Sequence, residues 1–319
     1  MRILVRAPNW LGDAILSLPA VRAVRKHADQ LIIMAKPPVV DLYHGLADRI
    51  LDARWPLRAA IKNIQECAPD SVLLFQNSFY SALVPRLAGC RDIWGYDTYG
   101  RKFLLSRAVK PPRDIYSDHQ IYYHWRLATS LGLAQGEPQL SLQISDVAVL
   151  DGTCPWIGMS PGAKYGEAKR WPATSYVRLG MALAARGYRI ALFGSGTEMQ
   201  ACQSIAEAIG VAAQNLAGRT TVPQLIAGVS QCSLLVTNDS GPLHIASALR
   251  VPVVAIFGST EPRSTGPFGT HSIVLRRDLP CSPCHLRACP IDHRCMTRIH
   301  PEEVLDAVIR LSRVTSLEH

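Results

Sequence analysis

The feature that most constrains the fold of this chain is the repeated alternation of short apolar runs with helical patterns. Residues 2–6, 31–35 and 71–75 are expected strands in the first half, and residues 156–160 and 234–237 are examples in the second. Such Val-, Ile- and Leu-rich runs, separated by helices, are typical of parallel sheets that are covered by helices on both faces. The sequence therefore predicts an α/β fold of doubly wound parallel sheets.

Two series of these elements are separated by residues 134–155, a stretch rich in glycine and proline. A length of 319 residues also fits two domains. We expect domains at 1–150 and 151–316, and the sequence leaves open on which of them the final helix, 301–314, packs. Residues 317–319 look like the remnant of a purification tag.

The composition excludes several classes of protein. A chain with 48% hydrophobic and 18% charged residues is too apolar to be disordered. It contains no apolar run of the ~18 residues that would span a membrane, and its first residues do not form a secretion signal. We therefore expect a cytoplasmic protein whose nine cysteines are thiols or metal ligands rather than disulfides.

The formal charge of +9 is spread over both halves, with one local concentration at residues 86–113. A basic surface attracts nucleic acid, anionic lipid or phosphorylated substrates, and it can also be a simple solvated face. No nucleic-acid-binding motif accompanies the charge, so we expect no nucleic-acid partner. The residues concerned are Arg86, Arg91, Arg101, Lys102, Arg107, Lys110 and Arg113.

The loop after the first expected strand carries Asp13, the only acid in the first 28 residues. One interpretation makes Asp13 an N-cap that accepts hydrogen bonds from free backbone amides. The other makes it a general base that removes a proton from a substrate hydroxyl. Gly12 beside it would let the backbone approach a ligand closely.

In the second half, residues 238–244 follow an expected strand and open a helix. A helix N-terminus of this kind is an anion site, and the Ser240 hydroxyl could donate to a phosphate. The alternative is a plain helix capped by Asp239 or Ser240, with His244 as a core histidine. The loop at 160–172 also ends a strand; its basic residues suit a phosphate-bearing ligand or form a solvated loop, and they are Lys164, Lys169 and Arg170.

Two further motifs, at residues 193–198 and 281–295, each allow two interpretations. Residues 193–198 contain two glycines of a dinucleotide fingerprint, but Met199 stands where the third glycine belongs, which disfavours an NAD oxidoreductase. Glu198 is then either a nucleoside contact or an acid at a helix start. Four cysteines are spaced as in a metal site but lack the usual long gap, so a structural zinc and a loop of reduced thiols both stay open; they are Cys281, Cys284, Cys289 and Cys295.

Several stretches together resemble the lipopolysaccharide heptosyltransferases of glycosyltransferase family 9, most closely the heptosyltransferase II type. They include NWLGDAILSLP at 9–19, NSFYSALVP at 77–85, PGAKYGEAKRWP at 161–172, NLAG at 215–218 and TNDSGPLHIASAL at 237–249. The resemblance implies a GT-B fold, in which two Rossmann-like domains face a central cleft. It also implies that the first domain binds the acceptor and the second the nucleotide-sugar donor.

The activity that this resemblance implies is inverting transfer of heptose from ADP-L-glycero-D-manno-heptose to heptosyl-Kdo2-lipid A. A different nucleotide sugar or acceptor on the same fold is the alternative. No cofactor is expected to be required, because a cationic cradle can replace a metal; a divalent metal is possible but not obligatory. The lipid-linked acceptor and the basic stretch imply peripheral contact with the inner membrane surface.

The resemblance also assigns roles to residues. Asp13 falls on the catalytic base and Lys169 on a lysine that contacts the diphosphate and sugar. Ser240 stands where the heptosyltransferase I type usually has Thr, and both side chains supply a hydroxyl. The positions expected to bind substrate are Gly12, Asn77, Gly162, Ala163, Glu198, Asp239, Ser240, Gly241 and His244.

Overall fold

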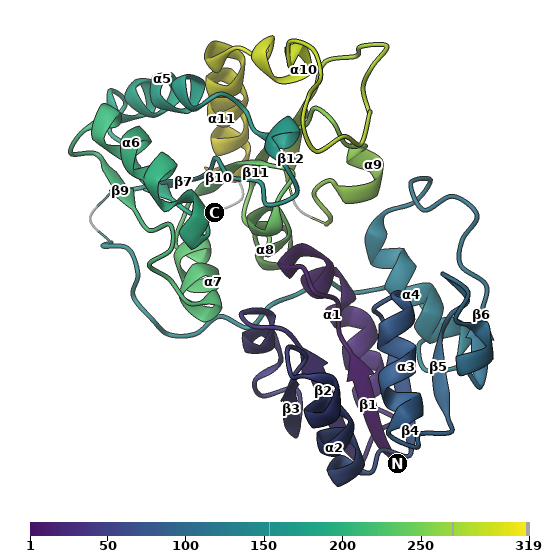
Figure 1. Cartoon of the computed structure of the whole chain (residues 1–319). Helices are drawn as coiled ribbons and strands as arrows, with labels where there is room; N and C mark the ends of the chain where they lie inside the picture. Colours follow the sequence, from purple (N-terminus) through teal and green to yellow (C-terminus); the bar gives the residue numbers. More distant parts are fainter. Residues whose placement is uncertain (153, 270, 317–319) are drawn as a thin grey trace. The chain divides into compact units, whose positions relative to one another are not determined.

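A computed structural model describes residues 1–152, 154–269 and 271–316, and it divides the chain into two compact units (Figure 1). The first is Met1–Leu140, and the second begins at Ser141. The division falls within the 134–155 stretch that the sequence marks as the connection. Each unit has one six-stranded sheet in which every pair of neighbouring strands is parallel. The predicted α/β fold with two parallel sheets is confirmed.

The first sheet has the strand order β3-β2-β1-β4-β5-β6. Helix α1 packs against α4 and helix α2 packs against α3. The strands are β1 (Arg2–Arg6), β2 (Gln30–Ala35), β3 (Arg49–Asp52), β4 (Ser71–Leu74), β5 (Ile93–Tyr96) and β6 (Arg107–Val109). The helices are α1 (Leu11–Arg25), α2 (Leu57–Cys67), α3 (Phe79–Leu87) and α4 (Gln120–Ser130), with 3-10 turns η1 (Val39–Tyr43) and η2 (Lys102–Leu104).

The second sheet has the order β12-β11-β10-β7-β8-β9, which is the same topology counted from β7. Its strands are β7 (Trp156–Ser160), β8 (Arg189–Leu192), β9 (Ala213–Asn215), β10 (Leu234–Asn238), β11 (Val253–Ile256) and β12 (Ser272–Leu275). Its helices are α5 (Ala173–Ala184), α6 (Met199–Ile209), α7 (Val222–Ser230), α8 (Gly241–Leu249), α9 (Pro262–Thr265), α10 (Arg294–Thr297) and α11 (Pro301–Ser316), with 3-10 turns η3 (Glu167–Lys169) and η4 (Gly196–Glu198).

In both sheets the chain order reverses between the first and fourth strands of the unit. These are β1 and β4 in the first unit and β7 and β10 in the second. In open parallel sheets, ligands bind beyond the carboxyl ends of the strands at such a reversal. The loops that follow these four strands are therefore the places where each unit is expected to bind substrate.

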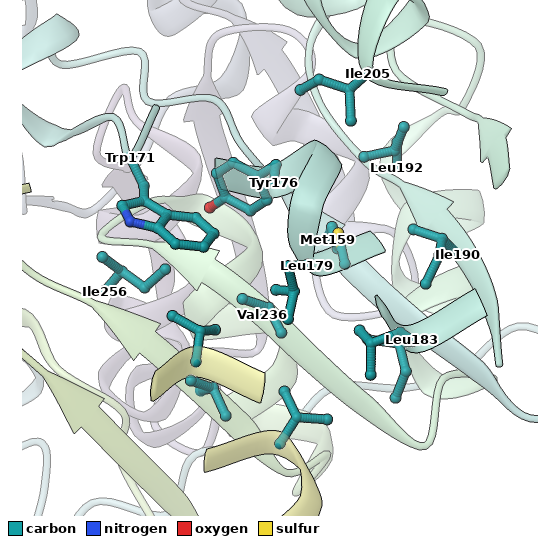
Figure 2. Packing of buried hydrophobic residues seen from close by; sticks show 14 of the residues in the cluster. Met159, Trp171, Tyr176, Leu179, Leu183, Ile190, Leu192, Ile205, Val236 and Ile256 are labelled. Carbon is teal, nitrogen blue, oxygen red and sulfur yellow. The ribbon is translucent and has the colours of Figure 1, made fainter. Parts of the chain in front are cut away.

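The core of the second unit is built from apolar side chains of the sheet and of α5, as Figure 2 shows. Leu179 and Leu183 of α5 lie over Met159 and Val236 of the central strands. Trp171, only 2% exposed, donates from its indole nitrogen to the Ile299 carbonyl at 2.8 Å. This bond ties the segment before α5 to the turn before α11.

Helix α11 belongs to this same core. Its apolar face contributes Val304, Ala307, Val308 and Leu311 to the cluster of the second unit. The sequence left open whether the last helix packs on the first or the second domain. In the structure it packs on the second unit. The expected tag remnant, 317–319, lies outside the described residues. None of the helices described is long and apolar enough to cross a membrane.

A buried histidine lies in the core of the first unit. His124 of α4 packs edge-on against Phe75, with ring centroids 5.3 Å apart. Burial lowers the pKa of His124 from 6.5 to about 4, because desolvation disfavours the imidazolium. Within the described part of the chain, its Nδ1 has no hydrogen-bond partner. His124 is therefore a neutral core residue at physiological pH.

This burial makes the stability of the fold depend on pH. The unfolded chain protonates His124 below pH 6.5 and the folded chain only below about 4, so stability is lost as the pH falls through this window. We expect the wild type to lose about 2 kcal/mol more than His124→Leu between pH 7 and pH 5, measured by urea unfolding. His27→Leu, at an exposed position, is the control; parallel curves for wild type and His124→Leu would contradict the prediction.

Candidate functional site

Most of the predicted site residues lie in the loop or the first helical turn that follows one of the four strands at the two reversals. Gly12 and Asp13 follow β1, and Asn77 follows β4, in the first unit. Residues 162–169 follow β7, and residues 239–244 follow β10, in the second. Glu198 comes after the neighbouring strand β8. The structure thus groups the predicted residues into one set for each unit.

Asp13 lies in the first turn of α1, as its third residue. The N-cap of this helix is Trp10, in an extended conformation, so the interpretation of Asp13 as the N-cap is wrong. The carboxylate is half-buried and lies close to the positive end of the helix dipole. Its role as a general base stays a prediction.

Asn77 is held by its neighbours in the first unit. Its Nδ2 donates to the Tyr123 hydroxyl at 2.7 Å, and its Oδ1 accepts from Arg101 Nη2 at 3.3 Å. Arg101 is fully buried, which corrects the expectation that it belongs to a basic surface. Sequence reasoning had no signal for this burial, because the residues around Arg101 are mostly polar.

A buried ion pair is the centre of the second set. Lys169 Nζ lies 2.5 Å from Asp239 Oδ2, and the two side chains are 11% and 5% exposed. The same oxygen accepts from Thr260 Oγ1 at 2.6 Å and from Thr265 Oγ1 at 3.1 Å. The Lys169 ammonium also lies over the Tyr165 ring, 4.7 Å from its centroid. Of the three basic residues in this loop, only Lys164 and Arg170 match the alternative of a solvated basic loop, since both are exposed.

Asn238 joins the loops after β7 and β10 into one assembly. Its Oδ1 accepts from the Trp171 amide and the Tyr176 hydroxyl, each at 3.1 Å. Its Nδ2 donates to the Pro161 carbonyl at 2.8 Å. The side chain is fully buried, so all of these bonds are made without water. Asn238 thereby holds the Lys169 loop against the start of α8.

The start of α8 has no side-chain cap. Ser240 occupies the N-cap position but makes no capping hydrogen bond, and the bonds of Asp239 go to Lys169, Thr260 and Thr265. The interpretation as a simple capped helix is therefore wrong. Thr237 donates its one hydroxyl proton to the Asn238 carbonyl, so Ser240 must be the donor in its 3.1 Å contact with Thr237. Gly241 and the buried His244 form the first turn.

Glu198 has a structural role in its own turn. Its Oε2 accepts from the Ser195 amide at 2.7 Å and from the Ser195 hydroxyl at 2.8 Å, which completes a capping box. A Cβ on Gly162 would lie 1.8 Å from Glu198 Oε1, so a larger residue there would require the Glu198 carboxylate to move. Glu198 and Gly162 are thus in contact, beside the buried Ala163.

The cysteine-rich loop at 281–295 packs around the Lys169 loop. The Ala168 amide donates to the Arg287 carbonyl at 3.0 Å, and His293 Nε2 donates to the Ala168 carbonyl at 3.0 Å. The Tyr165 hydroxyl donates to the His285 carbonyl at 2.7 Å. These contacts fix both sides of η3, and on the side of the cysteine-rich loop they use two backbone carbonyls and the His293 ring rather than the thiols.

Of the four cysteines in this loop, Cys281 and Cys284 are exposed, whereas Cys295 is buried in the core. Burial is the main cause that raises the pKa of the Cys295 thiol, with the other three cysteines as further causes. Nowhere in residues 1–152, 154–269 and 271–316 do three or more His, Cys, Asp or Glu side chains form a group that could hold a metal ion.

Sequence reasoning missed Asn238, Thr260, Thr265 and Tyr165 as parts of this site. A signal for Thr260 was available, because it follows β11, the strand that neighbours β10 in the sheet. Loops at adjacent carboxyl ends meet, so its hydroxyl could have been expected near Asp239. No comparable signal shows that Thr265, in the short helix α9, would return to the same oxygen.

The two threonines should contribute unequally to stability. We expect Thr260→Val to lower the free energy of unfolding by about 1–3 kcal/mol, because it removes a short, buried hydrogen bond to a carboxylate. Thr265→Val, at a longer bond and a half-buried position, should cost less than about 1 kcal/mol. Urea unfolding of both variants measures the difference, and equal losses would refute the ranking.

Comparison with known proteins agrees with this geometry. The chain is 32% identical over 313 residues to lipopolysaccharide heptosyltransferase 2 of Escherichia coli, covering 86% of this chain and 88% of that protein. It is 27% identical to lipooligosaccharide heptosyltransferase 2 of Campylobacter jejuni, with 98% and 99% of the two chains covered. The solved structure of E. coli ADP-heptose LPS heptosyltransferase II superimposes with a TM-score of 0.84 at 29% identity, covering 99% of this chain and all of the other.

These similarities extend over both units, so the GT-B fold predicted from the resemblance is confirmed. The model of glycosyltransferase family 9 (heptosyltransferase) matches residues 57–294, which include β4 and Asn77 in the first unit and the Lys169–Asp239 pair in the second. The chain therefore belongs to glycosyltransferase family 9 and is a glycosyltransferase.

Proposed function

We propose that this enzyme transfers heptose, with inversion, from ADP-L-glycero-D-manno-heptose to the heptosyl-Kdo2-lipid A inner core of lipopolysaccharide. The proteins that this chain resembles support the donor and the pathway step, since they are lipopolysaccharide and lipooligosaccharide heptosyltransferases 2 and an ADP-heptose LPS heptosyltransferase II. The observation that carries the proposal is the buried Lys169–Asp239 pair beside an uncapped helix start.

The second unit would bind the donor. The diphosphate of ADP-heptose carries negative charge that grows on the leaving ADP as the glycosidic bond breaks. Lys169 and the positive end of the α8 dipole would stabilise that charge, and the Ser240 hydroxyl would exchange its Thr237 partner for a phosphate oxygen. Asp239 would hold the Lys169 ammonium in place, and its own charge is compensated by three donors.

The first unit would supply the base. The acceptor hydroxyl attacks the anomeric carbon on the face opposite the diphosphate, and the electron pair of the broken C–O bond leaves with ADP. Asp13 takes the hydroxyl proton, a step that contributes about 10²–10⁴ in rate. This single displacement inverts the configuration at the anomeric carbon. Lys169 and the start of α8 stabilise the charge on the leaving diphosphate, which a metal ion does in other transferases. The reaction therefore needs no metal ion.

A glycosyltransferase with a different nucleotide sugar or acceptor would use the same groups, because nothing in the Lys169–Asp239 pair distinguishes one sugar from another. A donor panel separates the two proposals. Release of ADP from ADP-heptose only when a heptosylated acceptor is present supports the assignment. Faster turnover with another nucleotide sugar would replace it with the alternative.

Asp13→Asn tests the mechanism. We expect kcat to fall about 10²- to 10⁴-fold, because an amide cannot accept the hydroxyl proton, while calorimetry shows unchanged ADP affinity. Glu66→Gln, at an exposed acid of the same unit, is the matched control and should keep full activity. A chelator should leave the wild-type rate unchanged. An Asp13→Asn enzyme that turns over normally would exclude Asp13 as the base.

A further inference from the structure

Three aromatic side chains of the first unit are exposed in two segments of the chain that meet at Phe79 and Phe103. Tyr99 is 79% exposed and Phe103 is 73% exposed, in the segment between β5 and β6. Phe79, at the start of α3, is 39% exposed, and its ring centroid lies 6.0 Å from that of Phe103. Single exposed apolar residues are common, but a group of large aromatics on one surface indicates an interaction site.

The turn that carries Tyr99 holds a costly conformation. Tyr99 and Gly100 both have left-handed backbones, with φ of 50° and 68°, and the Arg101 amide closes the turn on the Thr98 carbonyl at 3.2 Å. A bulky residue such as tyrosine rarely adopts positive φ, because its Cβ crowds the backbone. The backbone is therefore strained at Tyr99, whose aromatic ring is exposed to solvent.

The Arg101 side chain forms hydrogen bonds with the segments that carry the exposed aromatic residues. Its Nε donates to the Tyr96 carbonyl at 3.0 Å, and its Nη1 donates to the Gln76 and Ser78 carbonyls at 2.6 and 3.2 Å. One fully buried guanidinium therefore ties the Tyr99 turn to the segment that leads into Phe79. The aromatic side chains stand on a fixed base and do not depend on a flexible loop.

Basic side chains accompany the aromatic ones. Lys102 is exposed between Arg101 and Phe103, and Lys110 follows Val109, whose carbonyl accepts from the Asp97 amide next to the Tyr99 turn. Neither lysine forms an ion pair with a carboxylate in the described part of the chain. Two acids lie in this segment. Asp92 is engaged by Ser71, Trp94 and Ser106, and the half-buried Asp97 interacts electrostatically with Arg101.

We infer that this surface, formed by Phe79, Tyr99, Lys102, Phe103 and Lys110, docks on an anionic phospholipid bilayer. Aromatic rings prefer the interface between headgroups and acyl chains, and lysines are attracted to the negative headgroups. Each contribution is weak alone, and reversible peripheral binding needs both. A partner without negative charge would leave the lysines unexplained, and one without an apolar region would leave the aromatic rings unexplained.

The inference rests on the proposed function, since a lipid A-linked acceptor lies in a membrane. Arg101 also connects the surface to the predicted substrate residue Asn77, because its Nη2 donates to Asn77 Oδ1. Docking through this surface would bring the end of β4, where Asn77 lies, to the membrane plane in which the acceptor is embedded.

Vesicle co-sedimentation of the full chain tests the inference. We expect the wild type to bind vesicles of phosphatidylglycerol and phosphatidylcholine and to bind pure phosphatidylcholine much less. Phe103→Ser should weaken binding to the anionic vesicles about tenfold and Lys102→Gln about fivefold. Val211→Ser and Lys26→Gln, at exposed positions outside this surface, are the matched controls and should bind as the wild type does.

Activity separates this inference from the proposed function. On acceptor embedded in vesicles, Phe103→Ser should lose rate in proportion to its lost binding, whereas on a deacylated, water-soluble acceptor it should match the wild type. Absence of transfer to either acceptor would refute the function, and the vesicle data would still decide the docking. Wild-type vesicle binding by both variants would overturn the inference. So would concentration-dependent dimers of the wild type that Phe103→Ser abolishes, because a second copy would then be the occupant.

Discussion

The buried ion pair between Lys169 and Asp239 is the interaction on which the second unit's site depends. Taking both charges out of water is costly, and such a pair adds little net stability compared with apolar packing. The pair instead fixes the position of the Lys169 ammonium. If Asp239 were removed, the charge on Lys169 would stay almost buried without a counter-charge. Thr260, Thr265 and the Tyr165 ring all add to the same arrangement. Residues that follow β7 and β11 thus contact the same carboxylate oxygen of Asp239, which follows β10.

Support for this pair comes from parts of the chain that are distant in sequence. Asn238 ties the loop after β7 to β10, and the loop at 281–295 fixes the backbone of η3 through Ala168. Gly166 shows how close that approach is, since a Cβ there would lie 2.2 Å from the Arg287 carbonyl oxygen. The cysteine-rich segment, which sequence alone could explain only as a metal site or a loop of thiols, is therefore also a packing element of the site.

The sequence predicted the architecture well because buried parallel strands leave a strong signal. The apolar runs at 2–6, 156–160 and 234–237 are all strands of the centres of the sheets. The short edge strands β6 and β9 carry too few apolar residues to be found, and they are defined only by pairing with a neighbour. The loops that carry Lys169 and Asp239 were singled out because they end predicted strands, and the family resemblance singled out these two residues within them. The cap formed by Glu198 is a local contact with Ser195 and matches the alternative of an acid at a helix start. The burial of Arg101 was not predicted, because it depends on tertiary contacts.

The buried charge of Arg101 also affects the electrostatic potential at the surface of the first unit. All of its hydrogen-bond partners are neutral oxygens, and burial lowers its pKa only to about 10, so it stays charged at neutral pH. A positive charge that is enclosed by low-dielectric protein is felt at longer range than a solvated one, although the nearby Asp97 carboxylate offsets part of it here. The electrostatic potential above the Tyr99 turn is therefore set partly from inside the protein, where neither counterions nor modification of surface lysines can reach it.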